Sequence, residues 1–109
     1  MPEQGSHEAV DHLTGELERL PGVGGWYVLR LGPARSQQLR AGARRGFVPV
    51  AARVGGSAWD TSLMPMGDGT LFLALPAHVR RAEAVDEGDQ VRAVLRPRER
   101  PPAPRRGRW

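Results

Sequence analysis

The chain has 109 residues, no cysteine and a formal net charge of +4 at pH 7. This length fits one small domain with one core, and the absence of cysteine excludes a disulfide framework and a thiolate site. No apolar run reaches the ~18 residues of a membrane-spanning helix, and the polar N-terminus lacks the pattern of a secretory signal. We therefore expect a cytoplasmic protein that does not contact membranes.

The positive charge is concentrated near the C-terminus. Residues 96–109 carry six arginines and one glutamate, a net charge of +5, whereas residues 1–95 carry ten arginines and eleven acids, a net charge of −1. All 16 cations are arginine. Codon bias in a GC-rich genome explains this chain-wide absence of lysine better than a binding surface does.

The first half of the chain predicts strands around one short helix. Residues 1–11 have the character of a disordered terminus, and "HLTGELERL" favours a strand because its glycine weakens the alternative of a helix. After the turn cluster "PGVGG", "WYVLRL" is aromatic and β-branched, which predicts a strand. Pro33 suits a first helical turn, so residues 34–43 are expected to form a helix that Gly46 ends. "FVPVAARV" is then a strand, and Pro49 places it at an edge or in a bulge.

The second half predicts the same kinds of element. "AWDTSLM" alternates Trp59, Thr61 and Leu63 against polar residues, which is the period of a strand. The methionines and proline of residues 64–66 are expected to leave the sheet and cross a barrel end, because proline interrupts a ladder. "GDG" is a turn, and "TLFLAL" is a strand covered on both faces. "PAHVRRAEAV" is a short helix and "EGDQVRAVL" a last strand.

The two halves share one order of strand, glycine-rich turn, strand, proline, short helix, glycine and strand. Two strand-strand-helix-strand halves, each too small for a core of its own, predict one six- or seven-stranded β-barrel with two short helices. We expect this barrel to span residues 12–96, followed by a disordered arginine- and proline-rich tail over residues 97–109. Residues 62–66 have no evident counterpart in "ELERL".

Several motifs resemble the DUF1905 family, a bacterial domain of unknown function, between Leu13 and Leu95. The most specific of them is the run from Thr61 to Gly69. The resemblance implies a double-split, swapped-hairpin barrel related in architecture to AbrB and MazE. It also implies an association with bacteriocin-protection (OmpD-associated) modules, and it assigns no catalytic residue. The motifs that carry the resemblance are Gly25-Trp26, Gly55, Thr61-Ser62-Leu63-Met64-Pro65, Gly67-Asp68-Gly69, Arg80 and Gly88-Asp89.

Catalytic and metal chemistry have little support in the residues. Ser62, His78 and an acid (Asp68 or Asp89) supply the residue types of a hydrolytic triad, but no nucleophile elbow is present. The three histidines do not form a metal-ligand array, and both glycine groups lead into strands, so they are turns and not phosphate loops. We expect no catalytic residue, no metal and no cofactor, and we favour a protein that is not an enzyme.

A binding function is the interpretation that we favour. Large soft side chains near the expected crossing either plug the barrel or line a pocket at its mouth. A lined pocket would make the protein a binding module for a small molecule or a peptide. The candidate ligand-binding residues are Trp26, Trp59, Ser62, Met64 and Met66.

The alternative is a nucleic-acid-binding or regulatory module, by analogy with AbrB and MazE barrels. Its candidate polyanion-binding residues lie in the tail, which is otherwise a solvated terminus. A monomer is expected to close its own barrel, and a homodimer through an edge near Pro49 stays open. The tail arginines concerned are Arg98, Arg100, Arg105, Arg106 and Arg108.

Overall fold

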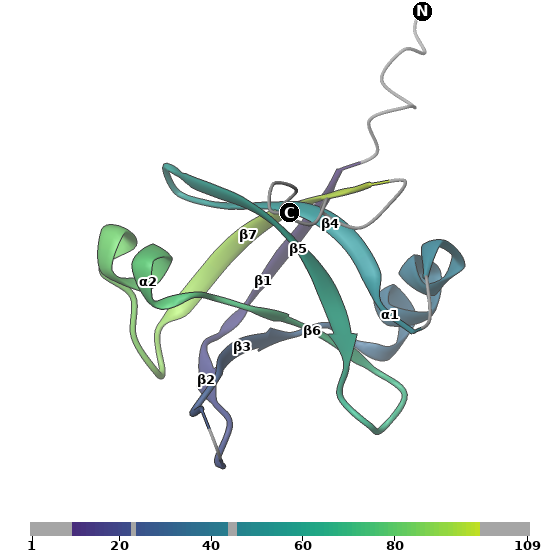
Figure 1. Ribbon diagram of the computed structural model, residues 1–109, viewed down its shortest axis with the longest axis horizontal. Coiled ribbons are helices and arrows are strands. Elements are labelled where there is room, and N and C mark those ends of the chain that lie inside the picture. The colour runs from purple at the N-terminus through teal and green to yellow at the C-terminus, as the bar shows by residue number, and fades with distance from the viewer. Residues whose placement is uncertain (1–9, 23, 44–45, 99–109) are drawn as a thin grey trace, which may run out of the picture.

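The structure is a computed structural model that describes residues 10–22, 24–43 and 46–98 (Figure 1). These residues form seven strands, two α-helices and one 3-10 helix, in the following order: β1 (Asp11–Glu16), β2 (Glu18–Arg19), β3 (Tyr27–Arg30), α1 (Pro33–Leu39), η2 (Arg40–Gly42), β4 (Val48–Val54), β5 (Ser57–Pro65), β6 (Leu71–Ala74), α2 (Ala77–Glu83) and β7 (Gln90–Pro97).

The strands join in one antiparallel sheet that curls into a nearly closed barrel. Their order is β1-β7-β4-β5-β6-β3-β2, and the two helices lie on opposite sides of the barrel (Figure 1). The predicted fold, mainly β with two short helices, is confirmed. The strand predicted in "HLTGELERL" is also confirmed, as β1 and β2.

At Leu17 the chain links the two ends of the strand order. β1 and β2 stand at opposite ends of the strand order, yet only Leu17 separates them in the sequence. Leu17 is fully buried. Its N–H donates to the carbonyl of Asp89 and its carbonyl accepts from the N–H of Gly88, both at 2.8 Å. One continuous segment therefore leaves β7, at one end of the sheet, and pairs with β3 at the other.

Hydrogen bonds repeat between the two halves of the chain. The N–H of Leu31 donates to the carbonyl of Leu71 at 3.0 Å, and the N–H of Leu75 donates to the carbonyl of Tyr27 at 2.8 Å. In each case the donor residue lies two positions before the first residue of a helix, and the acceptor lies on the paired strand of the other half. The predicted two-half construction is therefore visible in the pairing of β3 with β6.

The same repeat corrects one expectation about residues 62–66. The N–H of Met66 donates to the carbonyl of Thr70 at 2.8 Å, just as the N–H of Leu20 donates to the carbonyl of Trp26 at 2.7 Å. β5 first pairs with β4 and then with β6, as β1 and β2 pair with β7 and then with β3. The segment therefore has a counterpart in the first half, contrary to the prediction.

The predicted consequences of two strand prolines were wrong. β4 lies between β7 and β5, so Pro49 is not on an edge strand, and Pro65 stays in the sheet opposite Leu71. The carbonyl of Pro49 accepts from the N–H of Arg98, one residue beyond the last residue of β7. An N–H at this position would point to the same side as the carbonyl, because the N–H and the carbonyl of a strand residue share one side of the strand. Pro65 likewise lies beyond the start of β4. Proline is tolerated at both places because each lies just past the last paired residue of the neighbouring strand, where a missing N–H interrupts no ladder.

The core consists of leucines, valines and alanines that the strands and helices turn inward. Leu73 is fully buried on one face of β6, and Phe72 is 8% exposed on the other, where it forms a T-shaped contact with Trp26 with ring centroids 6.2 Å apart. The prediction that "TLFLAL" is covered on both faces is confirmed. The core cluster comprises Leu13, Leu17, Leu29, Leu31, Leu39, Val48, Val50, Ala52, Val54, Leu63, Leu71, Leu73, Leu75, Val79, Val91, Ala93 and Leu95.

Candidate functional site

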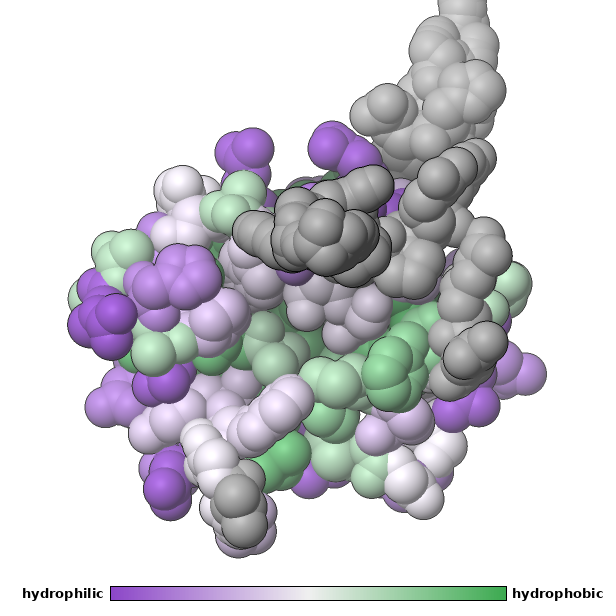
Figure 2. All heavy atoms as spheres, viewed as in Figure 1, coloured by the Kyte–Doolittle hydropathy of each residue, from purple (hydrophilic) through white to green (hydrophobic). Residues whose placement is uncertain are grey.

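A cleft of about 450 Å³ opens where β5 exchanges its pairing from β4 to β6. It lies between the end of the β2–β3 turn, the middle of β5 and the start of α2. Hydrophobic atoms are visible across the middle of the molecule, with hydrophilic atoms gathered toward the outside (Figure 2). The lining residues are Gly24, Gly25, Trp26, Tyr27, Trp59, Asp60, Thr61, Met64, Ala74, Leu75, Pro76, Ala77 and Arg80.

Two glycines shape the wall of this cleft that leads into β3. Gly24 and Gly25 have φ of +92° and +51°, a region that glycine enters without strain. A Cβ at Gly24 would lie 2.9 Å from Nε1 of Trp26, and a Cβ at Gly25 would lie 2.8 Å from the guanidinium of Arg19. The turn therefore lets the indole of Trp26 fold back against the backbone. Trp26 is still 45% exposed.

Trp59 forms part of the facing wall, from β5. It pairs with the buried Ala52 and is therefore on the inward face of the barrel, since directly opposite residues share a face. Its indole N–H is buried and has no hydrogen-bond acceptor among the described residues. A buried donor without an acceptor costs about 1–3 kcal/mol. The indole N–H of Trp59 is thus a polar group that the described part of the protein leaves unsatisfied.

Arg80 is the cation of the cleft, and its position is fixed at two points. Its Cζ atom lies 3.7 Å from the centroid of the Tyr27 ring. Its Nε donates to the carbonyl of Leu75 at 3.3 Å. No carboxylate pairs with Arg80 within the described residues. The stack on Tyr27 and the bond to Leu75 hold the guanidinium flat at the edge of the cleft.

The corresponding position in the first half is filled by a serine. Ser36 follows Leu31 by five residues, as Arg80 follows Leu75. Ser36 is fully buried; its hydroxyl donates to the carbonyl of Leu31 at 3.5 Å and accepts from the N–H of Leu71 at 3.0 Å. The small side chain is sealed inside, whereas Arg80 remains partly exposed beside the cleft. The two halves thus differ at the point where the cleft forms.

The sequence predicted three of these lining residues. Trp26, Trp59 and Met64 line the cleft, whereas Ser62 and Met66 do not. Ser62 pairs with the buried Pro49 of β4, and Met66 begins the hairpin to β6. A role for any of the five in binding stays a prediction.

Tyr27 and Arg80 were missed as site residues by the analysis of the sequence. Arg80 appeared only as one of the family motifs, and Tyr27 only as a strand residue. Nothing in the local sequence joins them, because the stack depends on the pairing of β3 with β6 and on where α2 begins. A search for aromatic residues facing a helix-borne arginine across the two halves is the signal that would have found them.

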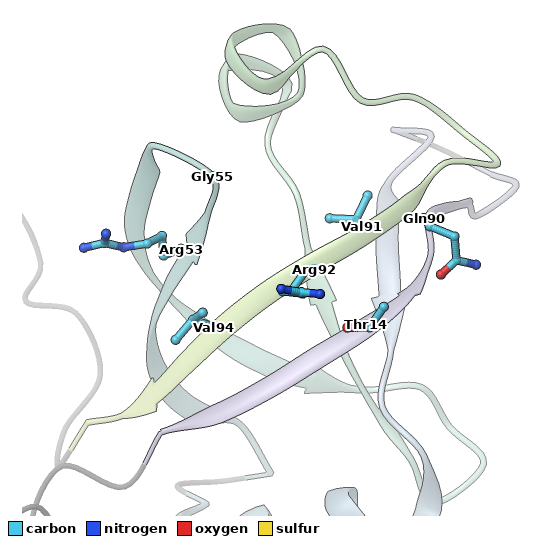
Figure 3. A pocket seen from close by; sticks show the side chains of 7 residues that line it. All are labelled: Thr14, Arg53, Gly55, Gln90, Val91, Arg92 and Val94. Carbon is cyan, nitrogen blue, oxygen red and sulfur yellow. The ribbon is translucent and has the colours of Figure 1, made fainter.

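A second hollow, of about 480 Å³, lies on the outer face of the sheet (Figure 3). Thr14 on β1, Arg92 and Val94 on β7 and Arg53 on β4 contribute side chains to it (Figure 3). Neither Arg53 nor Arg92 has a hydrogen-bond or ion-pair partner within the described residues. This face therefore carries two exposed guanidinium groups without an acidic partner.

The tail arginines are only partly described. Arg98 forms an ion pair with Asp60, and its N–H donates to the carbonyl of Pro49 at 2.9 Å. Arg98 therefore extends the contact of β7 with β4 and neutralises Asp60 beside the cleft. The remaining predicted polyanion-binding residues, Arg100, Arg105, Arg106 and Arg108, lie outside the described residues, so their role stays a prediction.

The residue types of a hydrolytic triad are not assembled. Ser62 and His78 form no hydrogen bond with each other or with an acid in the described ranges. Asp68 accepts from the N–H of Thr70 at 3.0 Å and from its hydroxyl at 2.5 Å, and Asp89 accepts from the N–H of Asp86 at 2.8 Å. Both acids therefore support turns.

The turn acid Asp68 has a lowered pKa. The hydroxyl of Thr70, and then its N–H, hold the pKa of Asp68 below its ordinary value of 3.8, with a smaller contribution from the charge of Arg30. Arg40 adds a bond from its guanidinium to the carbonyl of Gly69 at 3.1 Å, which ties this hairpin to the helical segment after β3.

No metal-binding cluster of three or more histidine or acidic residues exists in the part of the chain that the structure describes. In the same part of the chain, no helix is both long and apolar enough to cross a membrane. The family model for DUF1905, a domain of unknown function, matches residues 14–95, which span the barrel from β1 to β7. No curated protein matches the chain.

Proposed function

The chain belongs to the DUF1905 family, and from this premise we propose that it is a binding module, not an enzyme, which takes a small molecule or a short peptide into the cleft at the barrel mouth. The observation that carries the proposal is the guanidinium of Arg80 beside an apolar cleft, because its two terminal nitrogens have no partner among the described residues. A bound ligand that offers an acceptor would pair with them.

The size and lining of the cleft support a ligand of modest size. Its volume of about 450 Å³ lies within the range of about 300–1,000 Å³ that ligand sites occupy. Trp26, Trp59 and Met64 offer apolar surface, and Arg80 offers a charged group at the edge. An apolar cleft with a few placed polar groups is the usual form of a binding site.

The polar groups that line the cleft favour binding over catalysis. The carboxylate of Asp60 forms an ion pair with Arg98. The guanidinium of Arg80 stacks on Tyr27 and donates to the carbonyl of Leu75. Thr61 supplies a hydroxyl, but no histidine is among the described residues that line the cleft, and the neighbouring carboxylate of Asp60 is held by Arg98. A nucleophile needs an adjacent base to be activated, so the lining supports recognition.

A thermal-shift screen with metabolites and short peptides tests this function. A ligand should raise the melting temperature of the wild type, and Met64→Ala should weaken that effect because Met64 lines the cleft. Met66→Ala is the matched control, since Met66 is also half-buried but lies outside the lining. The proposal fails if no compound stabilises the protein, or if both variants lose the effect equally.

A second function, nucleic-acid binding, is favoured by the outer sheet face and the basic tail. Arg53 and Arg92 are exposed and unpaired among the described residues. The tail follows directly on β7, which carries Arg92. Each neutralised phosphate makes binding more sensitive to salt.

A gel-shift assay across salt concentrations separates the two functions. Binding to DNA should fall with salt, weaken in Arg92→Gln and weaken further when residues 99–109 are removed, a deletion that keeps Arg98. Arg81→Gln, on the exposed face of α2, should change nothing. If the full chain ignores DNA at low salt, this second function is removed.

A further inference from the structure

We infer that the ligand of the cleft carries a carboxylate next to a planar apolar ring; this inference rests on the proposed function and specifies its ligand. The structural basis is the arrangement of three side chains that line the cleft: the fixed guanidinium of Arg80, the ring of Trp59 and the exposed ring of Trp26.

The guanidinium of Arg80 supplies the site for the carboxylate. Its Nε is occupied by the carbonyl of Leu75, and one face of the group is stacked on Tyr27. The two terminal nitrogens have no partner in the described part of the chain. An arginine fork matches a carboxylate in a bidentate arrangement. Because the stack already restrains the group, little further ordering accompanies binding.

The aromatic side chains supply the site for the ring. Trp26 lies directly before β3 and Trp59 lies on β5, and both line the cleft together with Met64. Flat apolar faces favour stacking with planar rings, and thioethers contact ring edges favourably.

Charge argues against two other ligand classes. A cationic ligand would be attracted by the face of Tyr27, but Arg80 already covers that face and would repel it. A phosphate dianion would bring two negative charges to a lining whose other ionic group, Asp60, is an acid paired with Arg98. One unpaired guanidinium matches one negative charge, so a carboxylate fits better.

The shared chemistry, a ring and a carboxylate, has two sources. One source is a free aryl carboxylic acid, and the other is the C-terminal aromatic residue of a peptide. The cleft is open to solvent along Trp26, which is 45% exposed, so either source has a path to it. Two pairs of probes distinguish the sources and isolate the carboxylate at the same time.

Isothermal titration calorimetry on the full chain provides the test. The probes are indole-3-acetate against indole-3-acetamide, and N-acetyltryptophan against N-acetyltryptophan amide. Within the pair that represents the true source, the acid should bind at least about tenfold more tightly than the amide, as expected for a charge-assisted hydrogen bond. The pair with the tighter acid identifies the source.

Substitutions in α2 test whether the preference for the acid over the amide depends on Arg80. Arg80→Gln should bring the acid and the amide to the same affinity, and Arg80→Lys should lose most of the preference because the fork is lost. Arg81→Gln, on the exposed side of α2, should keep the full preference. Circular dichroism and the affinity for the amide show whether each variant is folded.

The outcomes separate this inference from the function on which it rests. Equal binding of acid and amide to the wild type overturns the carboxylate while leaving a binding cleft. A preference that persists in both Arg80 variants overturns the role of Arg80. If none of the four probes binds but the thermal-shift screen yields another ligand, the carboxylate inference is wrong and the binding function stands. If the screen also yields no ligand, the inference and the proposed function are both wrong.

Discussion

The backbone of Leu17 is bonded to the turn before β7, with its N–H donating to the carbonyl of Asp89 at 2.8 Å. This bond lies at the point where the first strand segment leaves β7 and joins β3. Leu63 marks the corresponding point of the second half, where β5 leaves β4 and joins β6. Both leucines are fully buried. The two exchange points therefore hold the barrel together from inside.

We predict that Leu17→Ala lowers the free energy of unfolding by about 2–5 kcal/mol, because it leaves a cavity at a fully buried exchange point. Urea unfolding followed by circular dichroism measures this change. Leu20→Ala, three residues later and only half-buried, should cost clearly less. A loss below about 1 kcal/mol for Leu17→Ala would show that closure does not depend on this side chain.

We predict that Asp68 makes the β5–β6 hairpin sensitive to acid. Because Thr70 lowers the pKa of Asp68 in the folded protein, its stabilising contribution is present above pH 3.8 and is lost as the pH falls below that value toward the folded pKa. The difference in stability between wild type and Asp68→Asn should shrink over that range.

A carboxyl titration by NMR checks the cause. In Thr70→Val the pKa of Asp68 should rise toward its ordinary value, although the remaining N–H of residue 70 keeps part of the shift. Thr14→Val, on the exposed face of β1, should leave it unchanged. An unaltered pKa in Thr70→Val would contradict the assignment to the hydroxyl.

We predict that Trp59→Phe does not lower the free energy of unfolding, because removing an unsatisfied buried N–H offsets the loss of ring volume. The same change should weaken ligand binding. Thermal unfolding and calorimetry on one preparation give both values. A destabilisation above about 3 kcal/mol, typical of a tightly packed core tryptophan, with undiminished affinity would assign Trp59 to the core and not to the site.

Glu83 is predicted to couple α2 to the β4–β5 hairpin. Its carboxylate accepts from the hydroxyl of Ser57 at 2.6 Å and from the N–H of Gly56 at 3.4 Å. Glu83→Ala should cost about 1 kcal/mol and increase hydrogen exchange at residues 55–57. Glu87→Ala, on the exposed turn after α2, serves as the control. Equal exchange in both variants would exclude this coupling.

The sequence predicted the barrel because its two halves repeat the same order of elements and because period-2 alternation fixes which strand residues face inward. It also predicted Trp26, Trp59 and Met64 near one another. Alternation could not exclude Ser62, because Ser62 shares its face of β5 with Asp60 and Met64, and both of these line the cleft.

The remaining features depend on contacts that no local pattern contains. Pro49 is tolerated inside the sheet because β7 ends at Pro97, opposite Val50, and that ending is set by register. The stack of Arg80 on Tyr27 joins the two halves of the chain. The unsatisfied N–H of Trp59 is visible only once its surroundings are assembled.

The most direct test of the central claim is the indole N–H signal of Trp59 in a ¹H–¹⁵N NMR titration with a ligand from the thermal-shift screen, assigned by its loss in Trp59→Phe. We predict that this signal shifts as the ligand fills the cleft, because the ring of Trp59 lines the cleft. A saturating ligand that leaves the Trp59 signal in place would contradict the claim that this cleft is the binding site.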